Sequence, residues 1–443
     1  MKRTDLDSHS TLSDNYTRLR LAGASVMSEE VSDELVAVTR KDGFSLEEIE
    51  DGKKIQANLS KNTDPESEAF FGILERITEG HRDELYQNSM IGLSERRRNQ
   101  LPSLGWVDNY TPSPDLIERY QSKVLDLQKN LSTNPNMENR KGRVFHQKQT
   151  LGFAAKLTVK ADLPSHARIG PFTTPGDYKA VVRFSNGQGV PFRDKNPDVR
   201  AISIKSFPNK RETDLLMTSG PGLLARDIEE FIRLAEVMVA EQVTGEGLRS
   251  LIDTGEETIK QRLVDNQIHP YEATRMAQLI TGRVVPVPPS PAGLQFWSSI
   301  VRAGDYVFKP TLVPSENNGT SELTGDPDDP DCIRNDLLSR IQKGGLNYTL
   351  RLLFFTDDYV TPINDATSAW DASPCQVDVA DLEIVETSSK TGPTEEQIQQ
   401  MPFNPNNGFD GVAITKARDE IYYAGARGRD AALLAQYQSF FDK

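Results

Sequence analysis

Short runs in which apolar and polar residues alternate, divided by Gly and Pro, dominate the sequence from about residue 143 onward. In AAKLTVKADL, the apolar side chains of Leu157, Val159, Ala161 and Leu163 fall on one face of a strand, and polar ones fall on the other. The same alternation follows in YKAVVRFS, RAISIKSF, DLLMTS, NYTLRLLFF and QVDVADLEIV. Repeated half-buried strands predict an antiparallel sheet or barrel rather than a parallel sheet.

Two details interrupt this strand pattern. In the last run the apolar phase shifts between Val379 and Leu382, which predicts a β-bulge. An amphipathic helix is expected between strands, because apolar residues recur at steps of four and three at Leu224, Ile228, Phe231, Ala235 and Met238. More helix is expected to continue to about Ile268.

The first 135 residues are polar and lack the strand pattern. A helix is expected to start near Asp115, because Leu116, Tyr120, Val124 and Leu127 share one helix face. The sequence therefore predicts an α+β chain in three parts. These are an N-terminal helical extension (1–135, with the first 30 or so residues partly disordered), a β-barrel with a helical insertion (136–390) and a C-terminal helical segment (391–443).

Charge and composition exclude several classes of partner. The net charge of −14 would repel phosphate backbones and anionic membranes, so no nucleic-acid partner is expected. No apolar run approaches the roughly 18 residues of a membrane span. The first residues lack the apolar centre of a secretory signal, so a cytoplasmic protein is expected, with Cys332 and Cys375 as unpaired thiols.

Several common catalytic motifs are missing from the sequence. The chain has five histidines without an HExxH spacing, and it has no GxxxxGK[ST] or GxSxG motif. His166 and His269 stand beside prolines and are expected to be structural. The acidic stretch at 315–332 is expected to be a solvated loop rather than a calcium site, because no glutamate closes it.

Two distant segments carry the residues of greatest chemical interest. RVFH, from Arg143 to His146, precedes the first strand, although a single histidine at such a place is more often structural than catalytic. Near the C-terminus, Arg418 and Arg429 stand four residues before and seven after Tyr422. Holding a tyrosine as phenolate at neutral pH costs about 4 kcal/mol, which nearby cations could offset. By composition alone Tyr423 is an equal candidate.

A series of stretches in consistent order between about residues 140 and 430 resembles the haem catalase family, closest in style to its shorter catalase-like members. They are RVFHQKQTLGFAAKLTVKADLPSHARIGPF, VVRFSNGQG, PDVRAISIKSF, DLLMTSGPGLLARD and FNPNNGFDGVAITKARDEIY, the last of these ending in the tyrosine segment. The resemblance implies a catalase-like antiparallel β-barrel with flanking helices, haem b as cofactor, and assembly as a homo-oligomer.

The resemblance also implies a role for each matching residue. His146 matches the distal histidine that moves a proton between the peroxide oxygens, and Ser185 matches the serine that orients it. Tyr422 matches the iron ligand, and Arg418 the arginine beside its phenolate. The remaining matches would contact haem itself. The propionates would pair with Arg143, Arg183 and Arg429, and the porphyrin ring would contact Phe231.

The chain departs from the family at the distal side. Thr218 stands where catalases have an asparagine, and Phe145 and Gln147-Lys148-Gln149 replace smaller residues, which predicts a reshaped pocket. The sequence therefore predicts a haem-dependent oxidoreductase that cleaves the O–O bond of H2O2 or an organic hydroperoxide. Two alternatives stay open: rearrangement of a fatty-acid hydroperoxide, as in allene oxide synthases, and haem binding without turnover.

Overall fold

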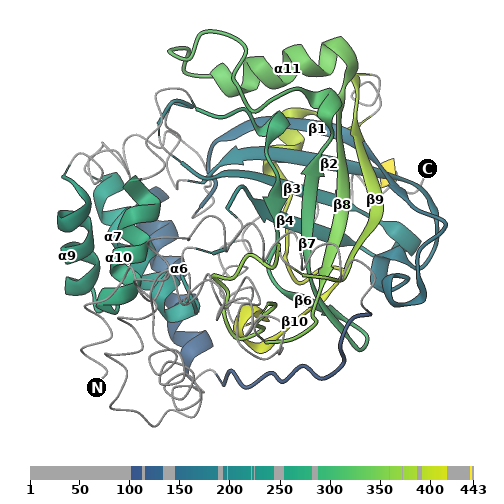
Figure 1. Cartoon of the computed structure of the whole chain (residues 1–443). Coiled ribbons are helices and arrows are strands. Elements are labelled where there is room, and N and C mark those ends of the chain that lie inside the picture. Colours follow the sequence, from purple (N-terminus) through teal and green to yellow (C-terminus); the bar gives the residue numbers. More distant parts are fainter. Residues whose placement is uncertain are drawn as a thin grey trace, which may run out of the picture. The chain divides into compact units, whose positions relative to one another are not determined.

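In the computed structural model, eight antiparallel strands close into a barrel (Figure 1). Around the ring they are β1 (Gln149–Val159), β2 (Gly176–Asn186), β3 (Arg200–Ser206), β4 (Thr213–Thr218), β5 (Phe296–Trp297), β7 (Tyr306–Pro314), β8 (Leu346–Phe354) and β9 (Gln376–Ile384). Pairing of β9 with β1 completes the ring, and β6 (Val301–Ala303) and β10 (Asp410–Gly411) continue from β7 outside it. The predicted antiparallel barrel is confirmed.

The structure describes residues 101–111, 115–132, 145–187, 193–196, 198–220, 222–223, 225–243, 254–281, 288–358, 360–371, 373–386, 392–416 and 440–441. The chain divides into two compact units, one made of Met1–Leu101, Thr356–Pro362 and Ala372–Cys375, and the other of all remaining residues. In the first unit, the Thr361 hydroxyl closes a turn by donating to the Asp357 carbonyl at 2.8 Å. The barrel and the helices of the described residues belong to the second unit.

The first strand shows how the alternating sequence builds the barrel wall. Leu157 and Val159 are 2% exposed, whereas the side chain of Lys156, on the other face, is 45% exposed and pairs with Glu383 of β9 at 2.8 Å. The strand ends at Val159, so Ala161 and Leu163 lie beyond it; Leu163 is buried as the alternation predicts, whereas Ala161 is exposed. The period-two pattern therefore identified the correct face and overestimated the strand's length.

The predicted bulge in β9 is present. Leu350 of β8 pairs with Ala380 and the next residue, Arg351, pairs with Asp378, so Val379 is an extra residue on the β9 side. A bulge of this kind shifts the alternation by one residue and increases the local twist. It lets both Val379 and Leu382 be buried although they are an odd number of positions apart.

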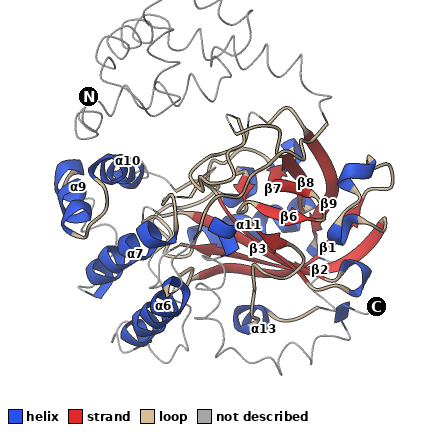
Figure 2. Ribbon diagram, turned by 90° about the horizontal axis from the view of Figure 1, so that it is seen from below, coloured by secondary structure: helices blue, strands red, loops and turns tan. Residues whose placement is uncertain are grey.

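A layer of helices lies at one side of the barrel (Figure 2). It contains α6 (Leu116–Ser132), α7 (Ile228–Val243), α9 (Glu256–Asp265) and α10 (Pro270–Thr281). The predicted apolar face of α6 is buried at Leu116, Tyr120 and Val124, where it packs on Ile228, Ile232 and Ala235 of α7. The expected helices at these two places are therefore confirmed.

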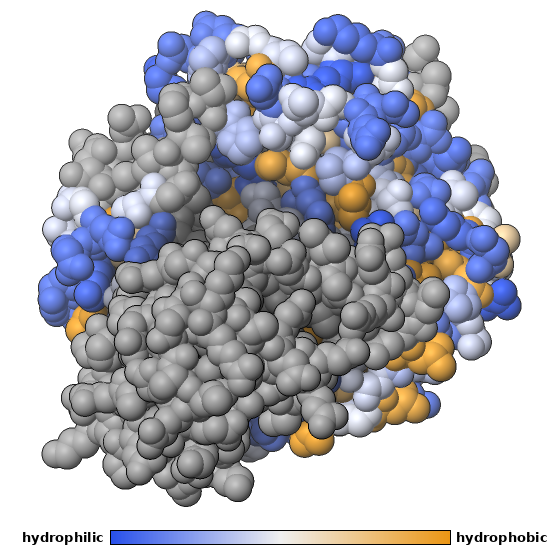
Figure 3. Space-filling view, in the orientation of Figure 1, coloured by the Kyte–Doolittle hydropathy of each residue, from blue (hydrophilic) through white to orange (hydrophobic). Residues whose placement is uncertain are grey.

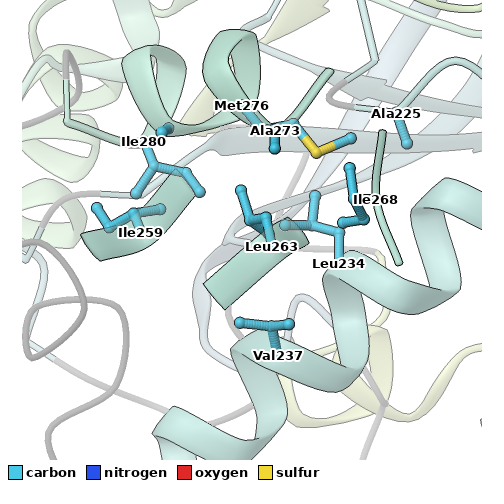
Figure 4. Packing of buried hydrophobic residues seen from close by; sticks show 10 residues of the cluster. Ala225, Leu234, Val237, Ile259, Leu263, Ile268, Ala273, Met276 and Ile280 are labelled. Carbon is cyan, nitrogen blue, oxygen red and sulfur yellow. The ribbon is translucent and has the colours of Figure 1, made fainter. Parts of the chain in front are cut away.

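The other face of α7 shares a core with α9 and α10 (Figure 4). Leu234 and Val237 of α7 meet Ile259 and Leu263 of α9 there. The expectation of further helix up to about Ile268 is confirmed for α9, which ends three residues earlier, while residues 244–253 lie outside the described residues. The helix α10 was not predicted, although Ala273, Met276, Ala277 and Ile280 show the spacing of a helix face and are fully buried.

Two further helices pack on the barrel. The helix α11 (Cys332–Gly344) follows the acidic stretch, and its buried Asp336 accepts hydrogen bonds from the Thr324 amide (2.9 Å) and the Arg340 Nε (2.9 Å). The first of these contacts fixes the acidic loop to α11. The short helix α13 (Glu395–Gln400) begins at Thr394 with a capping box formed with Gln397.

The described part of the surface in this view is mostly hydrophilic, including the region over α11 (Figure 3). Both cysteines are buried free thiols, as expected. Within the described ranges, no helix combines the length and apolar character of a membrane span.

Candidate functional site

His146 stands just before β1 in a left-handed backbone conformation, with φ of 57°. Its backbone N–H donates to the Gly187 carbonyl at 2.9 Å, which ties it to the end of β2. The left-handed conformation costs a residue that has a Cβ roughly 1–2 kcal/mol, so the surrounding contacts must hold the backbone of His146 in place. No pattern in the sequence signals this geometry.

The ring of His146 meets Ser185, the partner expected from the sequence. The Ser185 Oγ lies 3.4 Å from His146 Nδ1, and which of the two donates depends on the imidazole tautomer. Ser185 is 2% exposed on β2, so its position is set by the barrel wall. An imidazole engaged at Nδ1 presents Nε2 for proton transfer.

Thr218 lies in the same cross-strand row as Ser185. Ser185 of β2 pairs with Ala201 of β3, and Ala201 pairs with Thr218, the last residue of β4. Directly paired residues point to the same face of a sheet, and two strand spacings make about 10 Å. The barrel therefore places two hydroxyl side chains on one face with only the small Ala201 between them.

A small pocket adjoins Thr218. Hydroxyl groups and one amine contribute to its wall, from Ser298, Ser299, Thr415 and Lys309. The Lys309 amine is 2% exposed and donates to the Ser368 carbonyl at 2.6 Å. Trp297, also in the wall, donates from Nε1 to Asp371 at 2.6 Å, and burial raises the pKa of that carboxyl above its ordinary value.

Arg183 is buried beneath the His146 backbone. Its side chain is on β2 with 1% exposure, and its Nη2 donates to the carbonyls of His146 (2.7 Å) and Gln147 (3.3 Å). Its Nε donates to Oε1 of Gln399 on α13 at 3.0 Å. These backbone contacts were not anticipated from the sequence, and the expected contact between Arg183 and a haem propionate stays a prediction.

Aromatic rings lie next to His146. Phe145 and Phe231 of α7 meet edge to face with their centroids 5.4 Å apart. Both rings pack against the core shared by α6 and α7. Phe231 is thus brought beside the histidine segment, while its expected stacking on a porphyrin stays a prediction.

The long polar residues after His146 anchor the segment to its surroundings. Lys148 bridges Asp194 (2.9 Å) and Asp331 (2.8 Å), and Gln149 donates from Nε2 to the Glu395 carbonyl at 3.0 Å. Asp194 is fully buried and also accepts from the Ile333 amide at the start of α11, at 3.0 Å. Lys148 and Gln149 therefore bind neighbouring loops. The sequence had predicted instead that these residues reshape a pocket.

The other expected site residues are not all described. Arg143, Arg418, Tyr422 and Arg429 lie outside the described residues. His166 and His269 have structural surroundings: the His166 ring packs edge to face on Phe354, and His269 Nδ1 accepts from the Tyr271 amide at 3.3 Å at the start of α10. Among the described residues, His146, Ser185, Arg183, Thr218 and Phe231 form the candidate site.

Comparison with known proteins gives distant structural similarity. No family model and no curated protein matches the sequence. Among solved structures, the chain is similar to catalase A from Saccharomyces cerevisiae, with 14% identity, a TM-score of 0.46, and coverage of 78% of this chain and 70% of that chain. It is also similar to a fungal catalase, with 16% identity, a TM-score of 0.46, and coverage of 77% and 67%. Similarity at this level assigns neither a family nor an activity to the chain.

Proposed function

We propose that the chain is a haem-dependent oxidoreductase that cleaves the O–O bond of H2O2 or an organic hydroperoxide. The observation that carries the proposal is the contact between Ser185 Oγ and His146 Nδ1 at 3.4 Å. It joins two residues 39 positions apart that the catalase resemblance pairs from their sequence motifs alone. The groups near this contact also suit the distal side of a haem, which combines a proton-transferring imidazole with a hydroxyl and apolar rings. They are the ring of His146, the hydroxyl of Ser185 and the rings of Phe145 and Phe231.

The residues would divide the chemistry as follows. Haem b would supply the redox chemistry, with Tyr422 as its iron ligand and Arg418 favouring the phenolate form of that tyrosine. His146 takes the proton from one peroxide oxygen at Nε2 and returns it to the other oxygen, so that water or an alcohol leaves. Ser185 holds the other ring nitrogen and so fixes the tautomer and the direction of the ring.

The proposal also assigns roles to three arginines, to Phe231 and to Thr218. Arg143, Arg183 and Arg429 would pair with propionates, since guanidinium groups bind carboxylates with two hydrogen bonds. Phe231 would contact the porphyrin ring, and Thr218 would donate a hydrogen bond to a bound oxygen. As the catalase resemblance implies, the active protein would be a homo-oligomer, which light scattering of the full chain can measure.

Thr218 is the observation that favours a second candidate, the rearrangement of a fatty-acid hydroperoxide. Its side chain is shorter than the asparagine of catalases, and a small pocket adjoins it. A shorter side chain at this end of the row of Ser185, Ala201 and Thr218 would leave space for the substituent of an organic hydroperoxide.

The test is an absorption spectrum of the purified chain loaded with haem, beside Tyr422→Phe and the matched control Tyr423→Phe. The proposal expects a Soret band that changes in Tyr422→Phe and is retained in Tyr423→Phe. Oxygen release on adding H2O2 would identify a catalase, whereas consumption of a fatty-acid hydroperoxide without oxygen would identify the second candidate. A Soret band without turnover of any peroxide would leave haem binding alone, and a chain that binds no haem would overturn the proposal.

A further inference from the structure

Arg183 and Gln399 form a clamp on the backbone of the histidine segment. The Arg183 guanidinium donates to the carbonyls of His146 (2.7 Å) and Gln147 (3.3 Å). Gln399 accepts from Arg183 Nε at 3.0 Å and donates from Nε2 to the same Gln147 carbonyl at 3.2 Å. Three hydrogen bonds therefore connect two consecutive peptide groups to one arginine and one glutamine, and a fourth joins these two side chains.

The clamp lies in a buried part of the molecule, where its hydrogen bonds are strong. Arg183 is 1% exposed, and Val181 on the same face of β2 packs with Ile398 of α13 and with Met401 and Phe403, which follow that helix. Hydrogen bonds from a charged donor in a site that excludes water are stronger and shorter than those at a surface. A buried guanidinium also requires acceptors, and the two carbonyls and Gln399 supply them.

Gln399 is held in position by its own helix. The capping box of Thr394 and Gln397 starts α13, and Ile398 is fully buried against β2. The next anchor is Glu395, whose carboxylate contacts both terminal nitrogens of Arg334 on α11, one at 2.6 Å. The Glu395 carbonyl accepts from Gln149, which follows the clamped residues in the chain. The helix is thus tied to the segment that the clamp holds.

The residue under the clamp is strained. His146 has φ of 57°, and its ring makes a long contact of 3.4 Å with Ser185. The orientation of the peptide group at 146 determines where the ring points, because the side chain and carbonyl leave the same Cα. Without donors bound to that carbonyl, the backbone would relax toward the extended region and take the ring with it.

We propose that Arg183 and Gln399 are positioning residues that hold the left-handed backbone of His146 and thereby aim its ring. This deepens the proposed function and rests on it, because the ring is aimed for proton transfer to a peroxide. Gln399 comes from a segment 216 residues beyond Arg183 in the chain, and no sequence motif singles it out.

The experiment compares Gln399→Ala with Gln399→Glu and Gln400→Ala in the full chain. Gln399→Ala removes the acceptor for Arg183 and the donor to Gln147. Gln399→Glu keeps an acceptor for the guanidinium and so acts as the conservative variant. Gln400 is exposed on the same helix and provides the matched control. Thermal unfolding of each variant checks that a fold is retained.

The first readout is the ¹⁵N NMR spectrum of the histidine rings, which does not depend on haem or on turnover. The chain has five histidines, and His146→Gln assigns the signal of interest. Gln399→Ala is expected to shift the His146 ring signals and leave those of His166 and His269 unchanged. Gln399→Glu keeps the acceptor for Arg183 but loses the donor to Gln147, so it is expected to restore part of the wild-type position, and Gln400→Ala to show no shift.

The second readout is kcat/KM for peroxide with its pH profile. Gln399→Ala is expected to lower kcat/KM about tenfold, a typical loss for groups that orient a catalytic residue. It is also expected to shift the part of the pH–rate profile that reflects the ionisation of the catalytic histidine. Unchanged ring signals in Gln399→Ala would overturn the clamp, and would leave Arg183 with a propionate role only. A wild-type chain without haem or turnover would instead overturn the proposed function, while the ring signals would still decide on the clamp.

Discussion

Lys205 of β3 and Asp214 of β4 form an ion pair that is closed to water, with Nζ 2.6 Å from Oδ1 and neither side chain exposed. The Asp214 carboxylate also accepts from the Asn404 amide and the Asn407 side chain, both at 2.9 Å. These contacts attach the turn at residues 404–407 to the barrel. This turn precedes the C-terminal stretch in which the proposed iron ligand lies.

Asp214→Ala is expected to destabilise the protein by about 3 kcal/mol, because it removes one of the two carboxylates of the buried Lys205 ammonium and leaves only Glu212. The control is Asp381→Ala, which removes a half-exposed partner of Lys160 and should cost about 1 kcal/mol or less. Urea unfolding measures both. The double variant Lys205→Met with Asp214→Leu should be more stable than Asp214→Ala, and equal losses in all three variants would contradict this account.

Ser185→Ala should lower kcat/KM for peroxide about tenfold, because the ring of His146 loses its partner at Nδ1. The Soret band should stay in place, because the substitution does not touch the residues proposed to bind haem. Ser203→Ala is a suitable control, since Ser203 lies on the same face of β3 in the neighbouring row. Steady-state kinetics beside an absorption spectrum test this. Equal activity of the two variants would remove Ser185 from the proposed mechanism.

Thr218→Val keeps the size of the side chain and deletes its hydroxyl. If Thr218 donates to a bound oxygen, this variant should lose several-fold in peroxide turnover, and Thr218→Ser should keep most of it. Thr218→Asn should increase oxygen release from H2O2 relative to turnover of an organic hydroperoxide. Turnover in Thr218→Val equal to wild type would show that Thr218 is a passive part of the wall.

The stability of the helical layer should depend on pH through Glu230. This carboxyl is 4% exposed near the start of α7, and its burial raises its pKa above the ordinary value, with the nearby Glu272 adding to the rise and bonds from Arg226 opposing it. The folded protein therefore keeps the proton to a higher pH than the unfolded chain. The resulting stabilisation is complete below the unfolded pKa of about 4.3 and is lost as the pH rises through the folded pKa.

Glu230→Gln cannot ionise, so its free energy of unfolding should rise relative to that of the wild type between pH 4 and 7. Urea unfolding at several pH values measures this difference. Glu118→Gln, on the exposed side of α6, serves as the control. A constant difference for Glu230→Gln over the same range would show that burial does not govern this carboxyl.

Local patterns in the sequence predicted the elements of the fold well. The helix faces of α6 and α7 and the apolar face of β1 were predicted because side-chain periods of 3.6 and two residues follow directly from backbone geometry. The bulge at Val379 was predicted for the same reason, since a bulge changes the phase of an alternation. The helix α10 had a readable pattern too, at Ala273, Met276, Ala277 and Ile280.

The candidate site was only partly predictable. The pairing of His146 with Ser185 came from a family resemblance, and no periodicity indicates it. The contact of Arg183 with Gln399 joins residues 216 positions apart, so it depends on how α13 docks on the barrel. The positive φ of His146 is likewise a product of tertiary contacts, because histidine has no intrinsic preference strong enough to announce it.

The ring of strands is joined unevenly. Within the part of the chain that the structure describes, β4 and β5 share a single residue pair, Thr218 with Trp297, whereas β1 and β2 pair over almost their whole lengths. A seam with so few backbone hydrogen bonds opens at a lower free energy than the rest of the wall. Local opening at this seam would displace Thr218, so that a fluctuation of the barrel wall itself would change one end of the row formed by Ser185, Ala201 and Thr218.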